Sequence, residues 1–185
     1  MSLVAAAAVV FPVVTLVIGH ALASRLDRVK EQRILERERI ARVEQRRQRI
    51  LERRAEFERA VLIELQDVAN DYARATGASF HHDTIAHRKN GIAWGRQQLP
   101  DGVSDRHSEY QRRLNILIAR IGPGAVQERA RHLADICIRA IYAKSEAEAV
   151  AVMSGLGDAM TDLNEEVGRA LRRLDALEDE MVQIR

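Results

Sequence analysis

The chain has 185 residues, a formal charge of +2 and one cysteine, with 46% hydrophobic and 30% charged residues. This length allows one small domain, or one domain with an appendage, and excludes a large multidomain enzyme. The charge is unevenly distributed, because 2–24 contains no charged residue while 25–54 holds twelve Lys or Arg and six Asp or Glu.

Residues 1–24 predict a transmembrane anchor. As a helix, the apolar run Leu3–Ala23 would rise roughly 31 Å, which is close to the thickness of the hydrocarbon core of a bilayer. Pro12 and Gly19 interrupt the run, but lipid tolerates both far better than it tolerates a charge. We therefore expect a single crossing of the membrane.

Positive residues directly after the apolar run predict its orientation. Arg25, Arg28, Lys30 and Arg33 follow the run, and positive residues keep their end of a span in the cytoplasm. We expect a single-pass protein of the cell membrane, with its N-terminus outside and its C-terminal domain in the cytoplasm. These four residues are also the ones close enough to contact the membrane surface.

A cleavable signal peptide is the alternative interpretation of this segment. Ala21, Leu22 and Ala23 form an A-x-A site after the apolar run, and cleavage after Ala23 would give an exported protein. Only Met1 and Ser2 precede the run, without a positive residue, and Cys137 has no second cysteine with which to pair. Both features favour the uncleaved anchor.

Residues 25–54, which we call the stalk, predict one long helix, because they contain no proline or glycine and consist mainly of good helix formers. The net charge of +6 suggests nucleic acid as a partner. However, the positive residues are interleaved with Glu, and the stalk has no recognisable nucleic-acid-binding fold. Pairs such as Glu38 and Arg42 instead favour a helix that faces solvent or a protein partner. A heptad repeat also runs along the stalk, but charged residues occupy some of its a and d positions, so the stalk by itself would form a weak coiled coil. Its apolar positions are Leu26, Val29, Ile40, Val43, Ile50 and Phe57.

Residues 55–144 predict a helical bundle, because apolar residues recur every three or four positions in three segments. We expect helices over Ala55–Thr76, Ser104–Ile121 and Ala125–Lys144, with Gly77 ending the first and Gly122–Gly124 separating the other two. Cys137 lies in the apolar stripe of the third helix, which indicates a buried hydrophobic residue rather than a nucleophile.

Residues 145–185 predict a long C-terminal helix that resembles one strand of a coiled coil. Ser145 and Glu148 form an S-x-x-E capping box at its start, and Gly155 predicts a kink. Ten apolar residues follow at alternating spacings of three and four, and we call them the C-terminal seam. They are Met153, Leu156, Met160, Leu163, Val167, Ala170, Leu174, Leu177, Met181 and Ile184.

Short connections between these helices predict an all-α, up-and-down antiparallel bundle whose last helix runs antiparallel to the stalk. The segment 158–185 carries eight acidic residues and four Arg, a net charge of −4 against +6 in the stalk. We expect the acidic helix to pair with the stalk, within one chain or across a dimer. A parallel homodimer of the last helix is the alternative, because Arg173 with Glu178 and Glu180 with Arg185 would be favourable pairs between copies.

The polar insert 77–103 is the one segment without a clear helical period, and it contains His81, His82, Asp83 and His87. These four residues are the candidates for a metal or ligand site. Their spacing matches no zinc motif and the only cysteine is distant in sequence, so we expect solvated histidines, no metal and no cofactor.

The same insert has two candidate partner contacts, Phe80 and Trp94, which could instead pack the insert on the bundle. The turn signal Asn90-Gly91 also allows a short hairpin of Thr84–Lys89 with Ile92–Gln97.

Four short motifs carry a resemblance to known proteins. They are Arg53-Arg54-Ala55-Glu56, Glu64-Leu65-Gln66-Asp67, Arg112-Arg113-Leu114 and Ile118-Ala119-Arg120-Ile121-Gly122. With the order of the segments, they resemble a loose group of uncharacterised bacterial proteins that have one N-terminal span and a cytoplasmic helical domain. The order of anchor and charged helix is also similar to the b subunit of rotary ATP synthases. The expected breaks at 77–102 and 122–124 argue against that second family.

No catalytic or nucleotide-binding motif occurs, so we expect a protein that is not an enzyme. The preferred hypothesis is a membrane-anchored helical scaffold or tether that acts through protein–protein contacts, with membrane lipid, further copies of itself or another protein as partners. A metal- or ligand-binding membrane sensor centred on 77–103 is one alternative. A nucleic-acid tether that uses the stalk is the other, and nucleic acid is the less expected partner.

Overall fold

The computed structural model describes residues 3–96, 100 and 102–183, and side chains over 30–179 apart from 97–99 and 101. The described chain is all helical, as predicted, and contains no strand. It divides into two compact units, with the boundary between Leu51 and Glu52. The described residues contain five helices, four of them long.

The first helix, α1, covers Leu3–Asn90. It contains the predicted anchor, the stalk and the first predicted helix of the bundle, so the expected boundaries at residues 24 and 54 fall within one helix. The side chains of the predicted anchor Leu3–Ala23 lie outside those that the structure describes. Among the residues that were described, no helix combines the length and the apolar character needed to cross a membrane.

The predicted end of this helix at Gly77 is wrong, because α1 continues for thirteen further residues, to Asn90. The polar residues after Gly77 were expected to interrupt the helix, but their hydroxyl groups bond within it. Ser79 Oγ donates to the carbonyl of Ala75 at 3.2 Å, and Thr84 Oγ1 donates to the carbonyl of Phe80 at 2.9 Å. The predicted hairpin is wrong for the same reason, since its first strand would occupy helical residues.

The helix ends instead at the turn signal Asn90-Gly91. Gly91 has φ +66°, the left-handed conformation that favours glycine at the end of a helix. The amide of Ile92 donates to the carbonyl of Ala86 at 3.2 Å, and the carbonyl of Ile92 accepts from His87 Nδ1 at 3.0 Å. Within the predicted insert, the described residues that are not helical are therefore 91–96, 100 and 102.

The remaining helices are α2 (Val103–Arg120), α3 (Ala125–Ile141), α4 (Glu146–Met153) and α5 (Leu156–Gln183). The predicted break between α2 and α3 is confirmed. The long C-terminal helix is two helices rather than one, separated where the kink was predicted. The predicted cap is confirmed, because Ser145 Oγ accepts from the amide of Glu148 at 3.2 Å.

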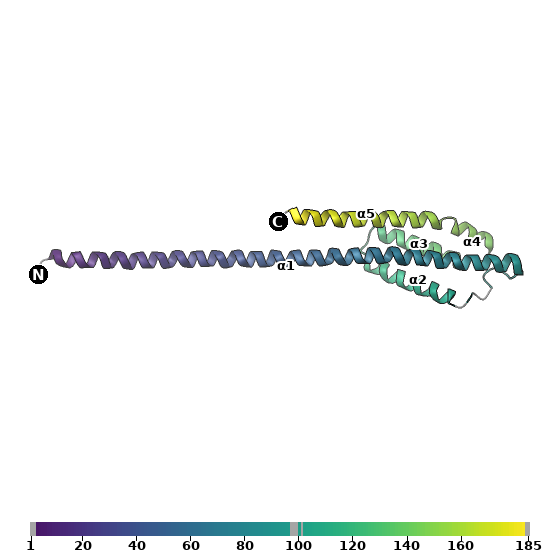
Figure 1. Ribbon diagram of the computed structural model, residues 1–185, viewed down its shortest axis with the longest axis horizontal. Coiled ribbons are helices and arrows are strands. Elements are labelled where there is room, and N and C mark those ends of the chain that lie inside the picture. The colour runs from purple at the N-terminus through teal and green to yellow at the C-terminus, as the bar shows by residue number, and fades with distance from the viewer. Residues whose placement is uncertain (1–2, 97–99, 101, 184–185) are drawn as a thin grey trace. The chain divides into compact units, whose positions relative to one another are not determined.

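In the second unit, α1, α2 and α3 alternate in direction, and α4 and α5 together run back in the opposite direction to α3, as Figure 1 shows. Glu64 of α1 contacts Arg113 of α2, while Tyr72, further along α1, contacts His107, earlier in α2. The same reversal relates α1 to the C-terminal helices, because Gln66 bonds Asn164 of α5 whereas Arg88 pairs with Glu146 of α4. This unit is thus an up-and-down antiparallel bundle.

Apolar side chains from α1, α2, α3 and α5 meet in one core. The largest fully buried apolar side chains are Leu62, Leu65, Tyr72, Leu114, Leu117, Leu133 and Leu163. The helix α3 packs on α2, α4 and α5, and its Leu133 is fully buried in this core. Burial of this apolar area is the main favourable contribution to the stability of the bundle.

Candidate interaction surfaces

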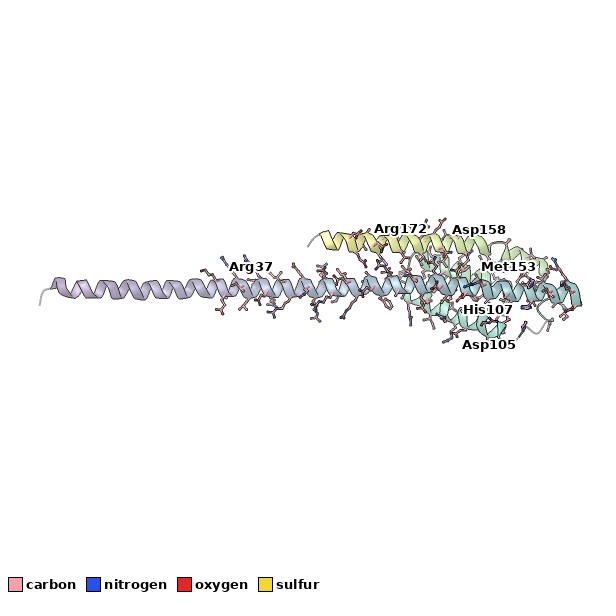
Figure 2. The ribbon with its side chains drawn as sticks, in the orientation of Figure 1. Arg37, Asp105, His107, Met153, Asp158 and Arg172 are labelled. Carbon is pink, nitrogen blue, oxygen red and sulfur yellow. The ribbon has the colours of Figure 1, made fainter. Side chains whose placement is uncertain are left out.

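The described stalk residues of the first unit, 30–51, leave large apolar side chains exposed on a charged helix. Nearly every side chain in this segment is exposed, and Figure 2 labels one of them, Arg37. The exposed large apolar residues are Ile34, Leu35, Ile40, Val43, Ile50 and Leu51. Most helices in proteins derive their stability from packing such residues against a neighbour. This segment is therefore a candidate surface for a partner.

The charges of the stalk lie among these apolar residues. Arg42 Nη2 donates to Glu38 Oε2 at 2.9 Å, which confirms the predicted pair. Both side chains are exposed, so the pair contributes little to stability. Of the predicted membrane-surface residues, Lys30 and Arg33 are exposed, whereas the side chains of Arg25 and Arg28 lie outside those described.

A shallow groove runs along the same helix. It is lined by Leu35, Glu36, Arg39, Ile40, Val43 and Glu44. Three of these side chains are branched and apolar, two are acidic and one is basic. The groove is thus suited to an apolar side chain of a neighbouring helix, flanked by charges of either sign.

The C-terminal seam is divided between core and surface. Leu163 and Val167 are fully buried, and Leu174 is nearly so. Leu156, Met160 and Ala170 are partly buried against the core, and Met153 is half-buried. Leu177 is 54% exposed, and the side chains of Met181 and Ile184 lie outside those described. Most of the described seam is therefore occupied within the chain.

Acidic residues of α5 pair within the bundle. Arg59 of α1 donates to both carboxylate oxygens of Glu178 at 3.0 Å and also contacts Asp175, so its pKa is raised above the ordinary value by these hydrogen bonds. On α5 itself, Arg169 donates to Glu166 and lowers the pKa of that carboxyl group. Arg59 lies beyond the end of the predicted stalk, so pairing of α5 with the stalk itself remains a prediction.

The proposed parallel pairing of the last helix would require charges that already have partners. Arg173 Nη2 lies 3.4 Å from Glu166 Oε1, and Glu178 bonds Arg59. The side chains of Glu180 and Arg185 lie outside those described.

The histidines of the predicted insert lie on the last turns of α1. Within the described residues, no group of three or more His, Cys, Asp or Glu side chains is arranged to hold a metal ion. The rings of His81 and His82 stand 6.1 Å apart, and His87 bonds the carbonyl of Ile92. Asp83 lies on the same helical segment, half-buried.

The aromatic pair of the insert packs together. The ring centroid of Phe80 lies 5.8 Å from that of Trp94, and the ring centroid of His87 lies 6.0 Å from that of Trp94 in a T-shaped arrangement. Both Phe80 and Trp94 are half-buried. Their contact holds the loop after α1 against the end of that helix.

A polar cluster that the sequence did not indicate lies inside the bundle. The ring of Tyr72 packs 4.8 Å from that of His107, which Figure 2 labels on α2. Neither the Tyr72 hydroxyl nor His107 Nε2 has a hydrogen-bond partner among the described residues, and both atoms are buried. Burial raises the pKa of Tyr72 and lowers the pKa of His107. The burial of His107 could not be predicted from the sequence, because the residues around it are polar.

We expect acid to destabilise the bundle through His107. Because burial lowers its pKa in the fold, the unfolded chain, with a pKa of about 6.5, binds more protons below that pH. The free energy of unfolding should therefore fall as the pH falls from about 7.5 to about 5.5, and His107→Phe should flatten this slope. Urea unfolding at several pH values, followed by Trp94 fluorescence, measures the effect. His132→Gln, an exposed histidine of α3, is the control, and an equal flattening by it would contradict the assignment.

We expect Cys137 to resist thiol reagents in the folded protein. Burial raises its pKa to about 11, against a smaller lowering by a hydrogen bond with Thr76. At pH 8 only about one thiol in a thousand would then be ionised, and the sulfur is inaccessible. Ellman's reagent should label the thiol in urea and not in buffer. Rapid labelling of the native chain would show that α3 opens readily.

No family description, curated protein or solved structure matches this chain.

Proposed function

We propose that this chain is a membrane-anchored helical scaffold that acts through protein–protein contacts on the cytoplasmic face. The supporting observation is the stalk segment 30–51, where large apolar side chains stand exposed on a long charged helix. Such a surface is typical of a helix with a partner. The bundle that follows supplies a stable body with its own core.

The anchor of this scaffold is the apolar run Leu3–Ala23, with Arg25 and Arg28 on its cytoplasmic side. The anchor would fix one end of the stalk at the membrane, and the bundle at the other end would be held in the cytoplasm. The proposed protein is oligomeric and has no catalytic role. Its function would lie in what it holds near the membrane.

Cell fractionation tests the anchor. We expect the full chain to stay in the membrane after an alkaline carbonate wash, and a variant without residues 2–24 to become soluble. Protease added to inside-out vesicles should digest the bundle, whereas protease added to intact cells should not. A mature N-terminus at Ser24, or a soluble full chain, would overturn the proposal.

Light scattering of the full chain in detergent tests the oligomer. We expect a protein mass that is a multiple of 20.9 kDa. A mass equal to one chain, at every concentration tested, would remove oligomer formation from the proposal and leave a monomeric tether.

A further inference from the structure

The groove on the stalk has the composition of one half of a coiled-coil contact. In a heptad frame on α1, Ile40 and Arg47 occupy a positions and Glu36, Val43 and Ile50 occupy d positions. Side chains at one a, two d and one g position form the hole that receives an a-position side chain from a parallel partner. Ile40, Glu36, Val43 and Arg39 are these four, and all four line the groove.

We propose that residues 33–51 of two copies of this chain pair as a parallel, in-register coiled coil. This inference rests on the proposed function and names the partner of its exposed helix. Ile40 of one copy would fill the groove of the other, and Val43 and Ile50 would meet their counterparts. Each of these three side chains is more than half exposed in the single chain, at 53%, 62% and 58%.

Charges beside the groove select a second copy in parallel orientation. In a parallel pair, a g residue faces the e residue five positions later in the other copy, so Arg39 faces Glu44. Because the two copies are related by two-fold symmetry, the dimer would contain this pair twice. In an antiparallel pair, g faces g, and Arg39 or Arg46 would then face another arginine. Parallel pairing is also the only one that places both anchors in the same membrane.

Arg47, at an a position, can be accommodated in this arrangement. In the paired helices, the long aliphatic part of Arg47 would cover the neighbouring apolar side chains, and its guanidinium group would stay in water. A polar residue at an a position reduces the stability of a coiled coil but fixes its register. The predicted pairing is thus specific rather than tight.

The C-terminal seam does not offer an equivalent surface. Leu163 and Val167 are fully buried in the core of their own chain, and Glu178 is bonded to Arg59. Pairing of two copies through these residues would require the bundle to open, whereas the groove on the stalk is already exposed.

Disulfide trapping in native membranes tests the pairing. Helix axes about 9 Å apart place facing d-position Cα atoms roughly 5 Å apart and outward f-position Cα atoms roughly 14 Å apart. A disulfide needs a distance of less than about 7 Å between the two Cα atoms. In a chain that carries Cys137→Ala, we expect about tenfold more linked dimer from Val43→Cys than from Gln45→Cys, the matched f-position control. Equal yields would overturn the proposal.

Charge exchange supplies a second test in the full-length protein in detergent. Glu44→Arg places a positive side chain opposite Arg39 of the other copy, and we expect the dimer to dissociate at about tenfold higher concentration. Arg39→Glu combined with Glu44→Arg should restore it. Glu38→Arg makes the same change of charge at an outward position and should leave the dimer intact. No rescue, or an equal loss in the control, would overturn the pairing.

These results separate the inference from the proposed function. A dimer mass with no preference for Val43→Cys would retain the oligomeric scaffold and reject pairing through the stalk. A soluble full chain that still links through Val43→Cys would retain the pairing and reject the membrane scaffold.

Discussion

Replacing Leu133 by alanine should destabilise the bundle by about 3–4 kcal/mol, because a cavity would replace a fully buried side chain. Leu133 belongs to α3, the helix that packs on α2, α4 and α5, so the cavity would weaken the packing of α3 in the core. Urea unfolding of the full chain in detergent measures this loss. Trp94, the single tryptophan, packs on Phe80 and reports the unfolding of its own unit.

Ile116→Ala is the matched control for this substitution, because Ile116 is 42% exposed on α2. We expect it to change the free energy of unfolding by less than about 0.5 kcal/mol. If Leu133→Ala also cost so little, Leu133 would not be packed in the core as the structure places it. If both substitutions lowered the free energy of unfolding by several kcal/mol, the face of α2 that carries Ile116 would be buried in a contact that the single chain does not show.

The regular apolar repeats made most of the bundle predictable. The segments that became α2 and α3 carry apolar residues every three or four positions, and the structure places their ends within three residues of the predicted ones, α3 ending at Ile141 rather than Lys144. The break between α4 and α5 was also predictable, since two glycines stand close together at Gly155 and Gly157.

The last turns of α1 were not predictable from large apolar residues, because small and weakly polar side chains line their buried face. Thr76, Ser79 and Ala86 are buried, and they continue the spacing of three and four residues that begins with Tyr72. The position between Ser79 and Ala86 in this spacing is Asp83, which is half-buried. A pattern of apolar residues alone does not show this face. The buried His107 was missed for a related reason, since its packing against Tyr72 depends on the fold of two helices.

The candidate interaction surface was partly predictable. The sequence indicated a charged stalk helix and the Glu38–Arg42 pair, and both occur in the structure. Which of the two apolar seams is free was not predictable, because both have heptad spacing. The structure resolves the question for the described residues, since the C-terminal seam is mostly buried within its chain and the stalk residues Ile40, Val43 and Ile50 are exposed.

A substitution of Gly77 tests whether α1 passes through this residue or ends at it. The two alternatives predict changes of opposite sign in the free energy of unfolding. In the structure Gly77 lies inside the helix, and an added Cβ would meet no atom within 4 Å. Gly77→Ala should therefore stabilise the bundle by about 0.5–1 kcal/mol, because alanine favours the helix and restricts the unfolded chain. Gly77→Pro should destabilise it by about 3 kcal/mol or more, through the lost backbone hydrogen bond and a clash with the preceding turn. Both changes are measured by urea unfolding of the full chain.

Gly91→Ala is the matched control, because Gly91 ends α1 in the left-handed conformation at φ +66°. There, alanine should destabilise the protein by about 1 kcal/mol, since its Cβ disfavours that conformation. Opposite signs for the two alanine substitutions would agree with a helix that passes through Gly77 and ends before Gly91. Destabilisation by both would mean that Gly77 itself ends the helix, as the sequence alone suggested, and would separate the histidine-containing segment from α1.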